Sequence, residues 1–442
     1  MPLRACLALA LTLLLAPLAP SGAESHPFTV HDLLALERLS EPQVSPDGTR
    51  VVFTVRRTDL EANRGRTDLW LAGTDGTGLR QLTTHEAGDF GARWSPDGAT
   101  IYFLSTRSGS SQVWRLAAGG GEPEQPVQVT DLPLDVANLV VSPDGSHLVF
   151  SLEVFPDCRE IACTVDRLAE REAQKATGLI YDRLFVRHWD TWKDGRRNHL
   201  FALATASGEP RLLMAGMDVD APSKPFGGTE ELAFTPDGRA IVFTAKDAGR
   251  VEAWSTNYVL WVAPLDGSVA PRRITAGNLA WDTQPVFSPD GRHLAYLAMS
   301  RPAFEADRFR VMVREGVDGA DREVAPGWDR SPDALLWSAD GRTLYATAQD
   351  VGQKTLFAID VASGEVRRVH SEGMANAPGL TADGRILFLL DHVKSPAELA
   401  SVRPDGSELT RITRFNDERL AAVRLGDAEQ MSFAGAEGAT VY

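Results

Sequence analysis

The sequence contains few cysteines and few lysines, and it has no long apolar run beyond its first residues. Only three of its 442 residues are Cys, and only six of its 45 basic residues are Lys, which we interpret as genome base composition. The net charge of −15 argues against nucleic acid or an anionic membrane surface as a partner. Hydrophobic residues make up 43 % of the chain, enough apolar material for a core, which excludes a disordered protein.

Familiar catalytic and metal-binding motifs are also missing from the sequence. It contains neither G-x-S-x-G nor H-E-x-x-H, and its nine His residues are scattered. No Cys/His cluster occurs, and no loop concentrates carboxylates at metal-ligand spacing. We therefore expect no cofactor and no metal, and we expect this chain by itself to lack catalytic residues.

The first residues resemble an export signal. Arg4 is a short basic region, Ala5–Ala16 is apolar, and Ser21-Gly22-Ala23 offers small residues for cleavage. The apolar run is too short for a membrane-spanning helix. Residues 1–23 are thus a predicted signal peptide, and the mature protein is expected in the periplasm or outside the cell, with no membrane partner after cleavage.

Two cysteines remain once the signal peptide is removed. Cys158 and Cys163 lie five residues apart. In an oxidising compartment such an isolated pair predicts a disulfide that closes a small loop. The alternative is a pair of free or metal-binding thiols.

One four-residue turn, S/T-x-D-G, recurs seven times. Its residues suit a type I turn: Ser or Thr at the first position, usually Pro at the second, then Asp and Gly. Successive copies start 50, 47, 93, 53, 50 and 43 residues apart, and we interpret the gap of 93 as one repeat with an insertion. The copies begin at Ser45, Ser95, Ser142, Thr235, Ser288, Ser338 and Thr381.

The segments around these turns have the composition of β-strands. A strand precedes each turn, and a second strand rich in β-branched and aromatic residues follows it, as in Ile241-Val242-Phe243. A third strand, a Gly turn and a short last strand complete each repeat. Four antiparallel strands in 43 to 53 residues predict an all-β fold, a seven-bladed β-propeller over residues 24–424. A β-sandwich would not explain the near-constant period.

The third repeat carries the insertion of nearly fifty residues. It contains the cysteine pair and a predicted helix over 165–177, with Thr164 as N-cap and Gly178 after its end. A segment rich in aromatic and charged residues follows, and Arg and aromatic side chains together suit recognition of a peptide. Its candidate substrate-binding residues are Arg187, His188, Trp189 and Trp192. The alternative is that the two Trp residues anchor the insertion to the blade.

A second candidate is the acidic pair Glu230 and Glu231, just before the fourth turn. Adjacent carboxylates at the start of an inner strand could bind a cation such as the free amino terminus of a peptide. The alternative is a solvated acidic turn. Glu170 and Glu172 on the predicted helix form a rival pair.

Three longer stretches give the repeats a family resemblance. They are residues 187–192, residues 224–231 and residues 298–308. Together with the S-P-D-G turns, they resemble the N-terminal propeller of the prolyl oligopeptidase family of serine peptidases. The branch that they resemble is that of secreted bacterial dipeptidyl-peptidase V and acylaminoacyl-peptidase-like enzymes, and the resemblance covers about residues 26–442. The turn alone is a weak signal, because TolB-type propellers share it.

The resemblance implies further features of the whole protein. Members of the family follow the propeller with an α/β-hydrolase domain that holds a Ser-Asp-His triad, and residues 425–442 resemble the start of the linker into it. The implied partners are peptide substrates and this C-terminal domain. A homodimer is a further alternative that the sequence does not decide. In dipeptidyl-peptidase IV-like relatives a Glu pair holds the amino terminus of the substrate. The motif around that pair is absent here, so Glu230 and Glu231 are candidates by charge and position only.

Two functions therefore fit the sequence. The first is the substrate-gating domain of a peptidase, inactive alone. The second is a TolB-like periplasmic binding propeller that acts through protein contacts. The three family-like stretches favour the first.

Overall fold

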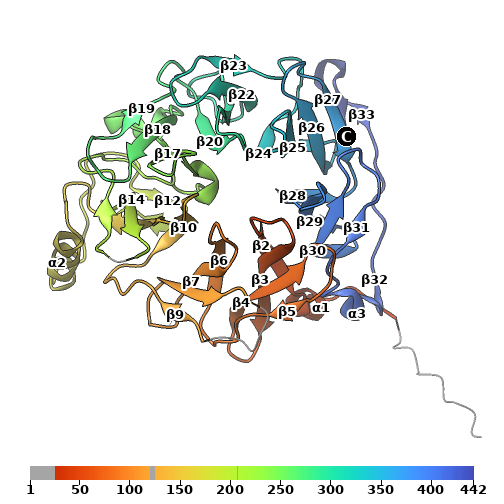
Figure 1. The fold of residues 1–442 in the computed structure, drawn as a ribbon, viewed down its shortest axis with the longest axis horizontal. Coiled ribbons are helices and arrows are strands. Elements are labelled where there is room, and N and C mark those ends of the chain that lie inside the picture. Colours follow the sequence, from red (N-terminus) through yellow and green to blue (C-terminus); the bar gives the residue numbers. More distant parts are fainter. Residues whose placement is uncertain (1–24, 120–124, 207) are drawn as a thin grey trace, which may run out of the picture.

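Antiparallel sheets follow one another around a ring in chain order (Figure 1). The computed structural model describes residues 25–119, 125–206 and 208–442. The predicted signal peptide, residues 1–23, lies outside these residues. The described chain is mostly β-structure with a few short helices, and this circular arrangement agrees with the predicted propeller.

Five of the sheets have four strands each. The first comprises β2 (Arg38–Val44), β3 (Arg50–Asp59), β4 (Arg64–Gly73) and β5 (Arg80–Gln81). The second comprises β6 (Asp89–Trp94), β7 (Thr100–Ser105), β8 (Gln112–Ala117) and β9 (Val127–Gln128). The third comprises β10 (Ala137–Val141), β11 (His147–Val154), β14 (Arg197–Ala204) and β15 (Arg211–Leu212). The fourth comprises β16 (Leu232–Phe234), β17 (Ala240–Ala245), β18 (Val259–Pro264) and β19 (Arg272–Arg273). The fifth comprises β20 (Asp282–Phe287), β21 (His293–Ala298), β22 (Arg310–Glu315) and β23 (Asp321–Glu323).

The last sheet is larger and consists of two groups of four strands. The first group is β24 (Pro332–Trp337), β25 (Thr343–Asp350), β26 (Gln353–Asp360) and β27 (Val366–His370). The second is β28 (Met374–Leu380), β29 (Ile386–His392), β30 (Ser395–Val402) and β31 (Thr410–Arg411). A single parallel pairing, Lys354 with Met374, links the two groups.

Short elements lie outside these sheets. The helices are α1 (Val30–Ala35), α2 (Ile161–Glu172) and α3 (Asp417–Leu420), with 3₁₀ turns η1 (Thr229–Glu231), η2 (Gly249–Trp254) and η3 (Ala436–Gly438). The remaining strands are β1 (His26–Pro27), which pairs with β32 (Val423–Arg424), and the hairpins β12–β13 (Arg187–His188 and Thr191–Trp192) and β33–β34 (Phe433–Ala434 and Thr440–Val441). No helix among the described residues is long and apolar enough to cross a membrane.

The S/T-x-D-G turns fold as their residues predict. Ser45 donates a hydrogen bond of 2.6 Å to Asp47, whose carboxylate also accepts from the backbone of Thr49 at 3.0 Å. The hydrogen bond from Ser45 is the main reason why the pKa of Asp47 falls to about 2. Gly48 ends the turn with φ of +71°, a conformation that other residues adopt at a cost. The Asp residues of the repeat therefore build turns.

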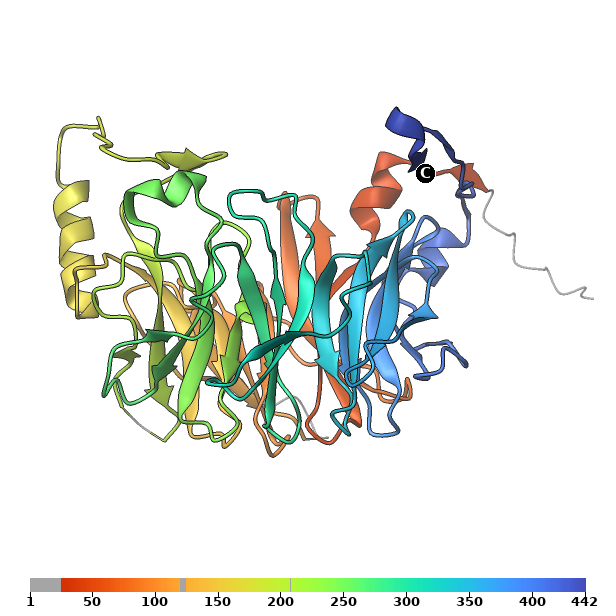
Figure 2. The same cartoon turned by 90° about the horizontal axis from the view of Figure 1, so that it is seen from above.

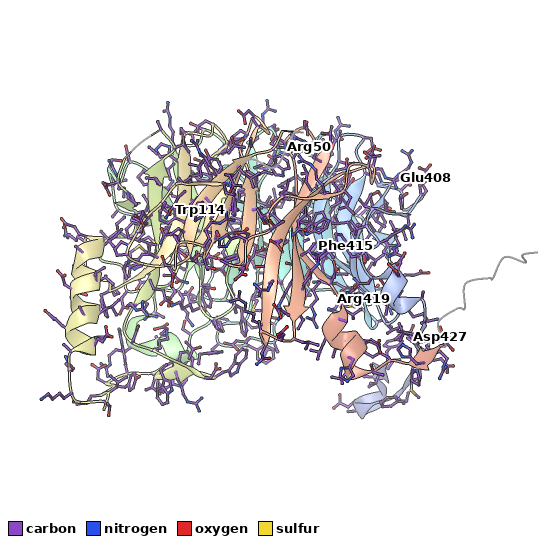
Figure 3. All side chains as sticks on the ribbon, turned by 90° about the horizontal axis from the view of Figure 1, so that it is seen from below. Arg50, Trp114, Glu408, Phe415, Arg419 and Asp427 are labelled. Carbon is purple, nitrogen blue, oxygen red and sulfur yellow. A yellow bond between two sulfur atoms is a disulfide. The ribbon has the colours of Figure 1, made fainter. Side chains whose placement is uncertain are left out.

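Each sheet is buried on both faces by its neighbours. Along β3, Val51 and Phe53 pack against Leu387 and Leu389 of β29, while the intervening Val52 packs against the second sheet. The same alternation recurs around the ring, because successive side chains of a strand point to opposite faces. Arg50, labelled in Figure 3, crosses the interface between the first and second sheets and lies 4.8 Å from the centre of the Trp94 ring.

The ring closes where the first and last strands meet. Phe415, labelled in Figure 3, packs edge-on against Trp70 of the first sheet at 4.9 Å. Asn416 exchanges two hydrogen bonds with the backbone of Glu37, at 2.9 and 3.0 Å. Segments nearly four hundred residues apart in sequence are thereby held together.

The insertion between β11 and β14 contains the predicted helix, but its predicted bounds are wrong. Helix α2 begins at Ile161 and ends at Glu172, and Thr164 lies inside it instead of capping it. The reason is tertiary: the hydroxyl of Thr164 is buried and accepts the backbone N–H of Phe155 at 3.2 Å. The predicted disulfide between Cys158 and Cys163 is present, with Cα atoms 5.6 Å apart.

The turn glycines allow a matched test of ring closure. Gly48 and Gly384 both have positive φ, but a Cβ at Gly48 would lie 2.3 Å from the backbone nitrogen of Ala382, whereas one at Gly384 meets nothing within 4 Å. We expect Gly384→Ala to cost about 1 kcal/mol from its backbone conformation alone. Gly48→Ala is expected to cost about 3 kcal/mol, because the β2–β3 turn and the β28–β29 turn must also move apart. Urea unfolding measures both; equal losses would contradict this description of the closure.

Candidate functional site

A cavity of about 800 Å³ opens beside the insertion, among loops of the second, third, fourth and fifth sheets. The loops that form it join the ends of strands on one face of the ring, the face from which the β12–β13 hairpin projects (upper in Figure 2). We call this the insertion face. The cavity thus lies where the regular repeat is interrupted.

Three segments contribute most of the cavity wall: the hairpin and the start of β14, the loop between β15 and η1, and the connection between β17 and β18. Residues 133–138 and, from the connection between β21 and β22, Glu305 complete it. Their lining residues include Phe185, His188, Trp189, Thr191, Trp192, Lys193, Arg196, Asp220, Ser223, Lys224, Phe226, Lys246, Glu252, Ser255, Tyr258 and Glu305.

The hairpin presents aromatic residues at the cavity. Arg187 pairs with Trp192 across its two strands, and His188 pairs with Thr191. The Arg187 guanidinium donates to the carbonyl of Trp189 and lies 5.9 Å from the centre of the Trp192 ring. Arg187 therefore fixes the backbone of the hairpin tip.

A second loop brings another aromatic residue to the same place. Phe226 lies 5.3 Å from Trp189 between ring centres and 6.0 Å from His188, both edge to face. Trp189 and Phe226 are each 68 % exposed. Two distant loops thus form an aromatic rim on the cavity.

The charged residues that line the cavity are largely paired, and two of them, Asp220 and Glu252, are paired with Arg197, which lies behind the lining. Arg197, the first residue of β14, is buried and donates to Asp218 and Asp220 at 2.9 Å and to Glu252 at 2.7 and 2.9 Å. Burial would lower the pKa of Arg197, but Glu252 and Asp220 raise it above its ordinary value. The arginine therefore stays charged and ties three segments of the wall together.

The far side of the cavity is built around Tyr258 and Trp281, which stack at 4.3 Å. Lys246 lies 4.7 Å above the Tyr258 ring and donates to the carbonyls of Glu252 and Ser255, both at 3.0 Å. Burial lowers the pKa of Lys246 and raises that of Tyr258. This cation is therefore held by carbonyls and a ring face and not by a carboxylate.

The structure places the sequence candidates differently. Of the four from the insertion, His188, Trp189 and Trp192 line the cavity, whereas Arg187 supports the hairpin behind them. Glu230 and Glu231 are not among the lining residues. The rival pair, Glu170 and Glu172, is exposed on α2 and also lies outside the lining.

Glu231 has a structural role, because its carboxylate holds the loop before β16 in place. It is only 3 % exposed and accepts hydrogen bonds from the backbone and hydroxyl of Ser223, at 2.7 and 2.8 Å, and from Thr283 at 3.3 Å. A Cβ at Gly227 would lie 2.4 Å from this carboxylate, so the loop closes tightly around it. Glu230 is exposed and accepts the backbone N–H of Gly228 at 2.8 Å. The pair does not present two free carboxylates.

The sequence reasoning missed every carboxylate that lines the cavity, among them Glu153, Asp220, Glu252 and Glu305. Glu305 lies in the connection between β21 and β22, within residues 298–308, one of the three stretches that carry the family resemblance. It makes no hydrogen bond or ion pair with any other described residue. The other three carry no local motif, because partners distant in sequence place them.

Comparisons with known proteins agree with this architecture. A family model described as TolB beta propeller domain matches residues 37–168. Dipeptidyl-peptidase 5 of Porphyromonas gingivalis is 28 % identical over 406 residues, which are 90 % of this chain and 57 % of that protein. Dipeptidyl-peptidase 5 of Aspergillus fumigatus is 24 % identical over 95 % of this chain and 61 % of its own length. The chain thus spans less than two thirds of the curated relatives it matches.

Solved structures give the same fold. The acylaminoacyl peptidase of Pyrococcus horikoshii matches with a TM-score of 0.67 at 14 % identity, over 93 % of this chain and 58 % of that one. The propeller domain of the trilobed protease from Pyrococcus furiosus matches with a TM-score of 0.57 at 13 % identity, over 86 % and 99 %. The predicted resemblance to a prolyl oligopeptidase-family propeller is confirmed. The fold is a β-propeller, as the repeats predicted.

The buried Glu231 generates a pH prediction. Burial raises its pKa to about 7 from an ordinary 4.5, so the folded protein holds a proton that the unfolded chain has already lost in this range. The stability associated with the protonated Glu231 is therefore fully present below pH 4.5, the unfolded-state pKa. It decreases as the pH rises above 4.5 and is lost once the pH passes 7, the folded-state pKa. We expect the stability of the wild type relative to Glu231→Gln to fall by roughly 2 kcal/mol between pH 5 and pH 8. Unfolding curves at both pH values measure the difference; a constant difference would contradict a protonated Glu231.

Proposed function

We propose that this chain is the substrate-gating propeller of an exported serine exopeptidase of the dipeptidyl-peptidase or acylaminoacyl-peptidase type. One observation carries the proposal: in a chain similar to dipeptidyl-peptidase 5, a cavity with an aromatic rim opens on the insertion face. Its volume of about 800 Å³ is in the range of small-ligand sites. Residues 425–442 lie on the same side (Figure 2), as a linker into a further domain would.

The propeller is proposed to have seven four-stranded blades. Its hydrophobic clusters support this count, because each of the seven joins neighbouring strand groups, including one between β24–β27 and β28–β31. On this count the large sheet is two blades. The insertion with α2 then belongs to the third blade.

The catalytic groups are proposed to lie in an α/β-hydrolase domain after residue 442, facing the insertion face. There a serine attacks the scissile carbonyl, a histidine acts as general base and an aspartate orients the histidine. The role of the propeller is to cover that site and admit short, unfolded peptides. The predicted signal peptide supports an oxidising location, periplasmic or secreted, and the disulfide in the insertion agrees with it.

The amino terminus of the peptide is proposed to bind a carboxylate of the cavity. Glu230 and Glu231 were the sequence candidates, but Glu231 already accepts hydrogen bonds from Ser223 and Thr283. Glu305 is exposed, lines the cavity and has no partner among the described residues. An ammonium group gains most from a carboxylate that is not already neutralised, which favours Glu305.

A second candidate function is a TolB-like periplasmic binding propeller that is active without a hydrolase domain. The match of a TolB propeller model to residues 37–168 supports it. The gene beyond Tyr442 distinguishes the two. An in-frame G-x-S-x-G there supports the peptidase, and a stop codon supports the binding protein.

Activity provides the direct test of the peptidase proposal. We expect the full-length protein to hydrolyse dipeptidyl chromogenic substrates in a reaction abolished by a serine-directed inhibitor. Residues 24–442 alone are expected to give no turnover. Inhibitor-sensitive turnover by this chain alone, or none by the full-length protein with dipeptidyl and acylaminoacyl substrates, would overturn it.

The cavity carboxylate is tested separately in the full-length protein. Glu305→Gln is expected to raise KM for substrates with a free amino terminus about tenfold, since an ion pair with the ammonium group is lost. Glu230→Gln is the matched control, an exposed carboxylate outside the cavity lining. An equal change in KM for both variants, or a larger change for Glu230→Gln, would remove Glu305 from this role.

A further inference from the structure

Trp189 occupies an unusual position for a bulky residue. It lies at the tip of the β12–β13 hairpin with φ of +46°, in the left-handed region that favours glycine and asparagine. Its side chain is nevertheless 68 % exposed, so packing within the fold does not account for a tryptophan there. An unfavourable backbone and an exposed ring together indicate a side chain used for contact with another molecule.

Phe226, the second aromatic residue of the rim, lies in a loop that hydrogen bonds hold in place. Phe226 is also 68 % exposed, and its loop is fixed by the hydrogen bonds of Ser223 to the buried Glu231. The hairpin is fixed by the hydrogen bond from Arg187 to the Trp189 carbonyl. Both rings are thus positioned before any ligand binds, which lowers the entropic cost of binding.

The chemistry of the cavity indicates what these rings contact. Of the lining residues, Asp220 and Glu252 are already paired with Arg197, which lies behind the lining, and Lys193 lies 3.4 Å from Glu252. Lys224 is likewise paired with Glu153. A charged side chain of a ligand would have to compete with these pairs. Of the remaining charges, Glu305 is proposed to bind the amino terminus, and Lys246 is held by two carbonyls. The rim offers unoccupied aromatic surface, where an apolar side chain gains by leaving water.

We propose that Trp189 and Phe226 form an aromatic clamp that selects peptides by an apolar side chain. This inference rests on the proposed peptidase function and adds the substrate class. The rings come from separate loops and meet edge to face at 5.3 Å, so each helps to position the other. Peptides that carry Leu or Phe at the contacted position are preferred over those that carry Ala or Ser.

The test uses the full-length enzyme and peptide substrates that differ at one position only, with Ala, Ser, Leu or Phe. The measured quantity is the ratio of kcat/KM for the Leu or Phe substrate to that for the Ala substrate. Trp189→Ala and Phe226→Ala are each expected to lower this ratio roughly tenfold at one substrate position, the contacted one. Trp189→Phe keeps an aromatic ring and is expected to retain most of the preference for Leu or Phe substrates.

Trp254 supplies the matched control. It is 65 % exposed on η2 and is not among the residues that line the cavity, so Trp254→Ala is expected to leave the ratio unchanged. The double variant Trp189→Ala/Phe226→Ala is expected to lose little more than either single variant, because the two rings act as a unit.

Three results would overturn the clamp. The first is an unchanged ratio at every position, with all variants folded by circular dichroism. The second is an equal loss of activity on all substrates, which indicates a structural role. The third is loss of association with another protein, without a change in the ratio, which assigns the rim to protein docking. Absence of turnover by the wild type overturns the proposed function itself and is distinct from these results.

Discussion

Every sheet of the ring, within the part of the chain that the structure describes, has two apolar faces that must be removed from water. Val51 and Val52 are adjacent in β3, yet both are fully buried, against different neighbouring sheets. Each sheet therefore needs a partner on either side, and only a closed ring supplies both partners to all of them. The interface between the first and last strands is consequently as important as any other. Three contacts hold it together: the packing of Phe415 on Trp70, the hydrogen bond between Asn416 and Glu37, and the close approach of Gly48 to Ala382.

The cavity lies where the regular repeat is interrupted. The insertion and three long connections lie on one face, and the buried guanidinium of Arg197 links β14, the β15–η1 loop and η2. A buried arginine surrounded by three carboxylates is costly unless all its partners are held in place, so the network fixes the floor of the cavity. The aromatic rim rests on this floor and on the loop closed by Glu231. The regular sheets thus form a rigid ring, and the irregular segments carry most of the side chains that line the cavity.

Most of the fold could be predicted from the sequence, because its signals are local. Each S/T-x-D-G turn closes through contacts within a few residues, as Ser45 with Asp47 shows, and the spacing of the turns determines the repeat. The disulfide is also local. The bounds of α2 could not be predicted, because the Phe155 backbone uses the Thr164 hydroxyl, a tertiary contact that overrides a capping signal. The site was only partly predictable: the Trp-rich hairpin was visible as a departure from the repeat. Glu252 was not, because Arg197, 55 residues away in sequence, positions it.

In the proposed function, the cavity on the insertion face receives the peptide. A crystal structure of the full-length protein, with a peptidyl inhibitor bonded to its proposed catalytic serine, would show this. We expect the inhibitor chain to extend from the serine into the cavity, with its amino terminus toward Glu305 and a side chain against Trp189 and Phe226. An inhibitor that contacts only the hydrolase domain and leaves the cavity empty would contradict it.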